Sequence, residues 1–199
     1  MPSSHKYEIR ATFDQKRIAI YQAFDSSIAE PALQNQKLVS PFSYSRMTWI
    51  KPSYLWLMYR SDWANRAGMG RILKIWIYRE AWDAALREAV LTTPESHVYK
   101  DAKKWRKMLD KASIRVQWDP ERDVYNNRLP YKSIQVGITP VLAKAYAREW
   151  IDAIEDCTQK TRQIRDLVYA RDFSSAKVLL PEETAYPVDG RIKQALGMS

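Results

Sequence analysis

Apolar and polar positions along the chain alternate between the spacing of strands and that of helices. Residues 17–24 form a short apolar run bounded by charged residues, which is typical of a buried strand. Residues 113–118 place Ile114, Val116 and Trp118 at every second position, with polar side chains between them. This period of two indicates a strand with one buried face.

Five such strands are predicted, and their order indicates the fold class. They span residues 17–24, 46–50, 72–78, 113–118 and 131–138. The last two flank residues 119–123, which we interpret as the loop of a hairpin. The pattern predicts a single α+β domain with a central, mostly antiparallel sheet flanked by helices.

Helices are predicted between these strands from start signals and from apolar spacings of three or four residues. Asp25 or Ser26 caps a helix to about Lys37, and Pro52 begins another because its fixed dihedral suits a first helical turn. A long helix starts at Pro140, includes Cys157 on its apolar face, and continues past a break near residue 158. Helices are also predicted over 80–91 and 99–111, and loops over 65–70 and 180–187.

Length and composition favour one globular domain over residues 1–199, since 46% of the residues are apolar. We expect about six residues at the N-terminus and about ten at the C-terminus to fray. No run approaches the roughly 18 apolar residues of a membrane span, so no membrane partner is expected. The single cysteine, Cys157, agrees with a reducing compartment, and a cytoplasmic location is the expectation.

The net charge of +9 is concentrated in part of the chain. Residues 31–79 hold eight Lys or Arg and one acid, Asp62, so this stretch should attract phosphates. A second basic segment, residues 99–111, is interpreted as a solvated helix face, with contact to nucleic acid or an acidic partner as the alternative. The expected partner is a nucleotide or nucleic acid, RNA more than DNA.

The segment 46–63 combines three Trp, two Tyr, two Arg and a Lys. Aromatic faces and cations together can hold a planar, anionic ligand such as a nucleotide. Arg46 and Lys51 bound the predicted strand, and the following helix N-terminus could receive a phosphate. Ser53 and Arg60 are further candidates for ligand contact, while pairing with acids or surface placement are the structural alternatives.

Three carboxylates in the predicted hairpin loop allow several interpretations. Asp119, Glu121 and Asp123 can pair with nearby arginines, or Glu121 can serve as a general base or electrostatic stabiliser. A divalent cation is a further alternative, but the glycine and spacing of a calcium loop are absent. His5 and His97 have no Cys or second His nearby, so no metal is expected.

Long motifs carry a resemblance to a known family. They are Tyr-Gln-Ala at 21–23, Arg-Met-Thr-Trp-Ile-Lys-Pro-Ser-Tyr-Leu-Trp-Leu-Met-Tyr-Arg-Ser at 46–61, Val-Gln-Trp-Asp-Pro-Glu-Arg at 116–122 and Ser-Ile-Gln-Val-Gly at 133–137. Over nearly the whole chain the sequence resembles domain-of-unknown-function family 4291, whose name implies no activity. Lys132 departs from the Arg expected there, which keeps the charge but not bidentate phosphate geometry.

The order of the predicted elements also resembles that of the ADP-ribosyltransferase superfamily, which uses NAD. The resemblance implies that Gln22 stands where a His bonds the ribose of NAD, and that Tyr54 or Tyr59 is the stacking tyrosine. Gln135, or Glu121 in the preceding loop, stands near the catalytic Glu. Gln in place of Glu removes the charge that stabilises an oxocarbenium-like transition state.

Two functions therefore remain open. One is an ADP-ribosyltransferase-like enzyme that binds NAD in a cleft lined by Tyr21, Gln22, Arg46, Lys51, Ser53 and Glu121. The other is a non-catalytic module that binds RNA or senses a nucleotide. They differ in whether Gln22, Glu121 and Gln135 converge beside Arg46 and Lys51, since catalytic groups must reach one reacting centre.

Overall fold

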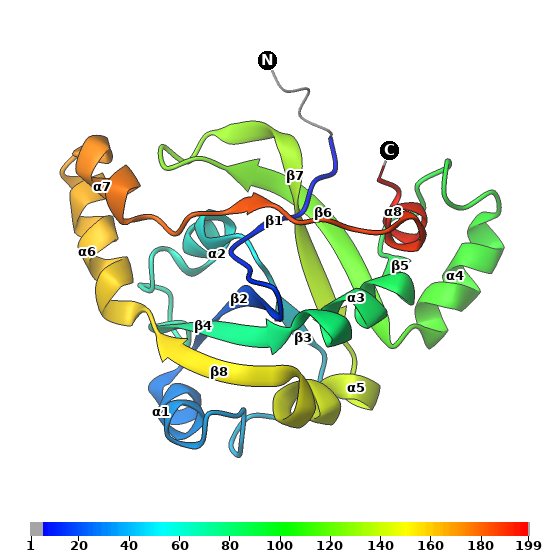
Figure 1. Ribbon diagram of the computed structural model, residues 1–199, viewed down its shortest axis with the longest axis horizontal. Helices are drawn as coiled ribbons and strands as arrows, with labels where there is room; N and C mark the ends of the chain where they lie inside the picture. The colour runs from blue at the N-terminus through cyan, green and yellow to red at the C-terminus, as the bar shows by residue number, and fades with distance from the viewer. Residues whose placement is uncertain (1–5, 199) are drawn as a thin grey trace.

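The computed structural model describes residues 6–198 and has the α+β fold of a single domain (Figure 1). Its strands are β1 (Arg10–Ala11), β2 (Arg17–Phe24), β3 (Thr48–Ile50), β4 (Arg71–Tyr78), β5 (Val90–Leu91), β6 (Ile114–Arg122), β7 (Arg128–Ile138), β8 (Ile151–Asp156) and β9 (Thr184–Ala185). Its helices are α1 (Ser26–Asn35), α2 (Tyr54–Ser61), α3 (Arg79–Arg87), α4 (Ala102–Lys111), α5 (Pro140–Ala145), the π-helix η1 (Tyr146–Trp150), α6 (Thr158–Tyr169), α7 (Phe173–Leu179) and α8 (Gly190–Leu196).

Two larger sheets and one short ribbon organise the domain, with mostly antiparallel pairing. One sheet has the order β2-β4-β8, the other β3-β7-β6-β5, and β1 pairs with β9. A single bridge joins the two sheets: the backbone N–H of Tyr21 in β2 donates to the carbonyl oxygen of Lys51, just after β3, over 2.6 Å. Within residues 6–198 no other pairing joins the two sheets, so side chains of β2 and of β6–β7 can face a common space.

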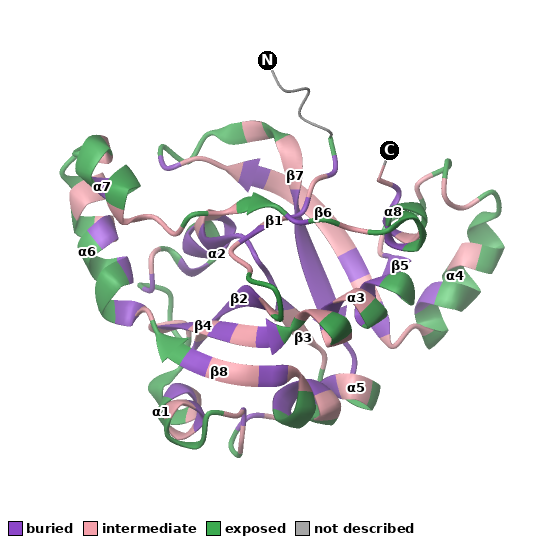
Figure 2. Ribbon diagram, viewed as in Figure 1, coloured by how far each residue is buried: buried purple, intermediate pink, exposed green. Residues whose placement is uncertain are grey.

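The main core fills the space between the sheets and the helices that cover them. Ile20, Ile75 and Val136 from the strands pack with Trp82 of α3 and Leu196 of α8, all fully buried or nearly so. In Figure 2 the central strands carry many of the buried positions, while α7 is largely exposed and α6 alternates exposed residues with buried ones. A second cluster under α2 joins Tyr54, Leu57 and Ile164.

Local signals predicted several elements well. Strand β2 has the predicted bounds, and Asp25 caps α1 by accepting from the N–H of Ser27. All five predicted strands are present, although β3 is shorter than expected. The helix predicted from Pro52 begins two residues later, because Ser53 is its N-cap.

The long helix predicted from Pro140 through Cys157 is wrong. The helix ends as the π-helical turn Tyr146–Trp150, and the chain then forms β8, an edge strand against β4. Ile151 and Ile154 fit a helical spacing, but a β-bulge opposite Trp76 and Ile77 lets both face the core from a strand. Pairing with β4 overrides the local pattern here. Cys157 is only partly buried and lies at the N-cap of α6.

Three boundary predictions are also wrong. Residues 119–122 belong to β6, so the hairpin turn lies at 123–127, where Asp123 accepts from the N–H groups of Tyr125 and Asn127. The helix predicted over 80–91 ends at Arg87, and β5 pairs in parallel with β6. The C-terminal residues form α8, whose Ile192 and Leu196 are buried, instead of fraying, and the predicted loop 180–187 contains the short strand β9.

Candidate functional site

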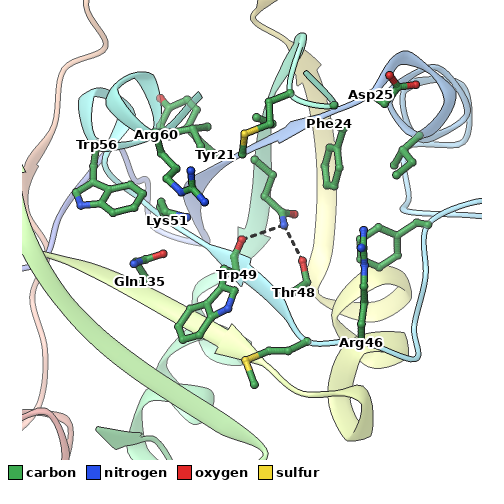
Figure 3. A pocket seen from close by; sticks show the side chains of 18 of the residues that line it. Tyr21, Phe24, Asp25, Arg46, Thr48, Trp49, Lys51, Trp56, Arg60 and Gln135 are labelled. Carbon is green, nitrogen blue, oxygen red and sulfur yellow. Dashed lines mark hydrogen bonds between the residues drawn. The ribbon is translucent and has the colours of Figure 1, made fainter. Parts of the chain in front are cut away.

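A cleft of about 890 Å³ lies where the two sheets part, beside the Tyr21–Lys51 bridge (Figure 3). It is bounded by β2, by the segment around β3, by α2 and by the facing strands β6 and β7. The polar and aromatic residues that line it include Tyr21, Gln22, Asp25, Phe42, Arg46, Thr48, Trp49, Lys51, Trp56, Tyr59, Arg60, Gln117, Asp119 and Gln135. A volume of this size suits a nucleotide or dinucleotide.

Lys51 brings a buried cation to the cleft wall. Its side chain lies against the ring of Trp56, with Nζ 4.6 Å from the ring centroid, and the residue is 7% exposed. Burial lowers the pKa of Lys51 to about 8; nearby Asp119 counteracts this effect and Arg60 adds to it. A partly desolvated ammonium gains most when an anion comes next to it.

Asp119 is the cleft carboxylate that the sequence interpretation missed. It accepts hydrogen bonds from the side-chain amides of Gln117, over 2.8 Å, and of Gln135 on the neighbouring strand. Gln117 and Asp119 face the cleft, whereas Trp118 between them points away and donates to the carbonyl oxygen of Leu196. Side chains two residues apart in a strand face the same side, so extending the predicted strand 113–118 by one residue would have placed Asp119 beside Gln117. The prediction of a loop over 119–123 prevented this inference.

Gln22 lies in the cleft with its side-chain orientation determined by protein contacts. Its amide nitrogen donates to the hydroxyl of Thr48 over 2.9 Å and to the carbonyl of Trp49 over 3.1 Å. Its amide oxygen accepts from the buried hydroxyl of Tyr146 over 2.6 Å. Both amide hydrogens are thus used, and the oxygen retains a second lone pair without a protein partner in residues 6–198.

The aromatic residues of the segment 46–63 divide between core and cleft. Tyr59 is 46% exposed and lines the cleft, whereas Tyr54 is 3% exposed and its hydroxyl bonds with that of Thr161. Trp49 lies over Gly137 of β7, where a Cβ atom would come within 2.9 Å of its ring. Of the two candidates for a stacking tyrosine, only Tyr59 has a face available to a ligand.

The predicted cations do not gather at one corner. Figure 3 shows Lys51 and Arg60 together at one end of the cleft, near Trp56 and Gln135, and Arg46 at the other end near Asp25. Arg46 and Arg60 are exposed. A ligand with charge at both ends, or a longer polyanion, could contact all three cations.

Ser53 and Glu121, both predicted to line the cleft, are buried elsewhere. Ser53 is the N-cap of α2 and accepts from the N–H of Trp56 over 3.2 Å. Glu121 lies two residues beyond Asp119 along β6, beneath the start of α2, and is 5% exposed. Burial raises its pKa, while hydrogen bonds from the Arg122 backbone and the hydroxyls of Ser53 and Ser133 lower it. Neither Ser53 nor Glu121 lines the cleft.

At the N-terminus of α2, where the sequence predicted a phosphate, a carboxyl group of the protein already accepts a hydrogen bond. The N–H of Tyr54 donates to Oε1 of Glu183 over 2.7 Å. Part of Glu183 is at the surface, but its carboxyl group is enclosed. Burial and the neighbouring Glu121 raise the pKa of Glu183 to about 8, against the opposing effects of the Tyr54 N–H and Arg10.

This carboxyl group leads to a prediction about stability and pH. The pKa of Glu183 is raised from 4.5 to about 8 in the folded protein. Its contribution to the free energy of unfolding is therefore fully present below pH 4.5 and is lost as the pH rises through 8. We expect Glu183→Gln, which keeps the acceptor for Tyr54, to have a higher Tm than the parent at pH 8.5 and a similar Tm near pH 5. Thermal unfolding across this pH range measures the effect.

The exposed neighbour provides the control, since Glu182→Gln should follow the parent at every pH. A Glu183→Gln variant that is less stable than the parent at pH 8.5 contradicts the prediction.

Within residues 6–198, no group of three or more His, Cys, Asp or Glu side chains is arranged to hold a metal ion. His97 contacts the carbonyl oxygen of Gly197 over 3.1 Å, and His5 lies outside the described residues. The three acids of 119–123 do not share a site, because each makes its own hydrogen bonds. In the described part of the chain none of them, Asp119, Glu121 or Asp123, forms an ion pair with Arg115, Arg122 or Arg128.

Over the same residues, no helix has both the length and the apolar character needed to cross a membrane.

The chain belongs to the family described as domain of unknown function (DUF4291), whose model matches residues 8–186. The matched region begins two residues before β1 and ends one residue after β9, and so contains every cleft residue named above. No protein with a curated description matches the chain.

Proposed function

We propose that this protein binds NAD in the cleft between its sheets and transfers ADP-ribose from it to an acceptor. The observation that carries the proposal is the convergence of Gln22, Lys51, Asp119 and Gln135, from four different segments, on one cleft of dinucleotide size. The fold order also supports it, because β2, α1, β3, α2 and β4 follow one another along the chain in the order of strands and helices that the superfamily resemblance implies.

The lining suits the parts of NAD. Lys51 and Arg60 offer charge to the pyrophosphate, and Tyr59 offers a ring face for stacking. The free lone pair of Gln22 can accept from a ribose hydroxyl. NAD is here a substrate, and the described residues supply all the groups used below.

The transfer needs a carboxylate that stabilises positive charge on the ribose and an acceptor nucleophile that displaces nicotinamide. The bond between the nicotinamide nitrogen and C1′ of the ribose breaks, and nicotinamide leaves with the electron pair. A nucleophile of the acceptor bonds to C1′ and loses its proton. Asp119, held by Gln117 and Gln135, faces the positive charge that develops on the ribose and takes the role the resemblance had assigned to Gln135 or Glu121.

The lone cysteine suits a reducing compartment, and we assign the activity to the cytoplasm.

A non-catalytic module is the second candidate. Gln22 and Asp119 both make hydrogen bonds within the protein, as residues with a structural role do. In that case the same cleft senses a nucleotide or binds RNA without breaking a glycosidic bond.

The two candidates are separated by binding and transfer measured on the same protein. We expect NAD to raise the Tm because it binds the native state, and ATP or ADP-ribose to do so less. Incubation with radiolabelled NAD and RNA or protein acceptors should then label an acceptor and release nicotinamide. If NAD raises the Tm but no acceptor is labelled, the protein is the nucleotide-sensing module. If none of the three nucleotides raises the Tm and no acceptor is labelled, the cleft is not a nucleotide site.

A further inference from the structure

A second cavity, of about 500 Å³, lies on the other side of Tyr59 from the candidate cleft. Its walls come from the end of α2, the loop that follows it, the β6–β7 turn, and the region where α6 and α7 meet. In Figure 1 the tip of the β6–β7 hairpin extends toward α7, and the rings of Tyr125 and Phe173 lie 4.4 Å apart there. Tyr59 lines both cavities, so ligands in the two would be neighbours.

This second cavity is lined by aromatic rings that remain accessible. Tyr59, Tyr125 and Tyr169 are 46%, 47% and 59% exposed, which is unusual for side chains of this size. The aromatic lining is Tyr59, Trp63, Tyr125, Tyr169 and Phe173. Several aromatic faces around one hollow form a stacking platform for planar rings.

The backbone that positions this platform is strained. Asp62, Trp63 and Ala64 are three consecutive non-glycine residues with positive φ, at 50°, 52° and 67°. L-residues adopt this conformation rarely, and almost never in succession. Such strain concentrates at ligand sites. Here it turns the chain so that Trp63 lines the cavity next to Tyr59.

Cations accompany the rings and lack acidic partners. The guanidinium carbon of Arg122 lies 4.2 Å from the centroid of the Tyr59 ring, and its buried Nε has no hydrogen-bond partner within residues 6–198. Arg66 forms no ion pair in the same part of the chain. Of the two acids in the lining, Asp123 uses both carboxylate oxygens to hold the hairpin turn, and Asp62 is exposed.

We propose that this aromatic cavity is the acceptor subsite and binds a base of single-stranded nucleic acid, RNA in particular. The inference rests on the proposed function, since it names the second reactant of that transfer. The candidate cleft is large enough for a whole dinucleotide, which leaves the aromatic cavity for another molecule. An unpaired base fits because its face can stack and its edge can meet Arg122, whereas bases in a duplex are already stacked. Lys177 and Arg66 at the rim suit the adjoining phosphates.

Fluorescence anisotropy with a labelled eight-nucleotide single-stranded RNA tests the assignment. We expect Tyr125→Leu and Tyr169→Leu each to lower RNA affinity about tenfold, because each removes one stacking face and keeps apolar volume. The matched control is Tyr78→Leu, an exposed tyrosine of β4 outside both cavities, which should bind RNA like the parent. NAD-induced increases in Tm should be the same in all three variants, and each Tm without ligand reports whether the variant folds.

The outcomes separate this inference from the proposed function. Unchanged RNA affinity in the folded Tyr125→Leu/Tyr169→Leu double variant overturns the subsite, and so does equal affinity for duplex and single strand. Loss of the NAD effect in Tyr169→Leu also overturns it, because the cavity would then take part of NAD. RNA affinity that depends on the tyrosines in a protein that never binds NAD supports base binding in the aromatic cavity but rejects the proposed function, and with it the role of acceptor subsite. Single-stranded DNA of the same sequence shows how far binding requires the 2′-hydroxyl.

Discussion

Replacing Asp119 with Asn is expected to lower the rate of ADP-ribose transfer about 10²–10³-fold, the usual effect of losing one electrostatic group aimed at a transition-state charge. Asn keeps an oxygen that can accept from Gln117 or Gln135, so the cleft should retain its shape. NAD binding should change little, because the positive charge develops only as the glycosidic bond breaks. Single-turnover release of nicotinamide and the NAD-induced change in Tm measure the two effects.

Glu121→Gln is the matched control for this prediction. It removes a carboxylate two residues further along β6 that is buried away from the cleft, and burial already favours its neutral form. We expect it to transfer ADP-ribose like the parent. Equal rates for parent and Asp119→Asn would exclude Asp119 as the catalytic carboxylate, and a loss confined to Glu121→Gln would reverse the assignment.

Lys51→Met is expected to lower NAD affinity about tenfold to a hundredfold, because it removes a desolvated charged donor from the phosphate end of the cleft. The same change should leave the Tm without ligand equal to or above that of the parent, since a buried cation with a lowered pKa costs folding free energy. Thermal unfolding with and without NAD measures both effects. A loss of binding together with a large drop in Tm would indicate a structural role instead.

The pKa of Lys51 adds a pH dependence to this binding. With a pKa of about 8, lowered from 10.5, the ammonium is charged below pH 8 and loses its proton above it. NAD affinity of the parent should therefore fall between pH 7 and pH 9.5, whereas Lys51→Arg should show little change because a guanidinium stays charged. Lys103→Met on exposed α4 is the control and should follow the parent. A flat profile in the parent contradicts this role for the lysine.

The amino-acid sequence by itself determined those features that depend on neighbouring residues. The charged boundaries and apolar run of β2, the cap at Asp25 and the pairing of two alternating segments as β6 and β7 are local patterns, and the structure confirms them. The family membership follows from long motifs in the same way. The concentration of rings and cations in residues 46–63 also located one wall of the cleft, because six of its members line it: Arg46, Trp49, Lys51, Trp56, Tyr59 and Arg60.

Only the tertiary structure decided which residues meet across long separations. The spacing of Ile151 and Ile154 suits a helix, but the open edge of β4 and a β-bulge made this segment a strand. Asp119 and Glu121 are two residues apart in one strand, yet Asp119 lines the cleft and Glu121 is buried outside it. The hydrogen-bond acceptor at the start of α2 comes from Glu183, 129 residues away from Tyr54. Such contacts depend on how the chain closes on itself, and no pattern within a short segment contains that information.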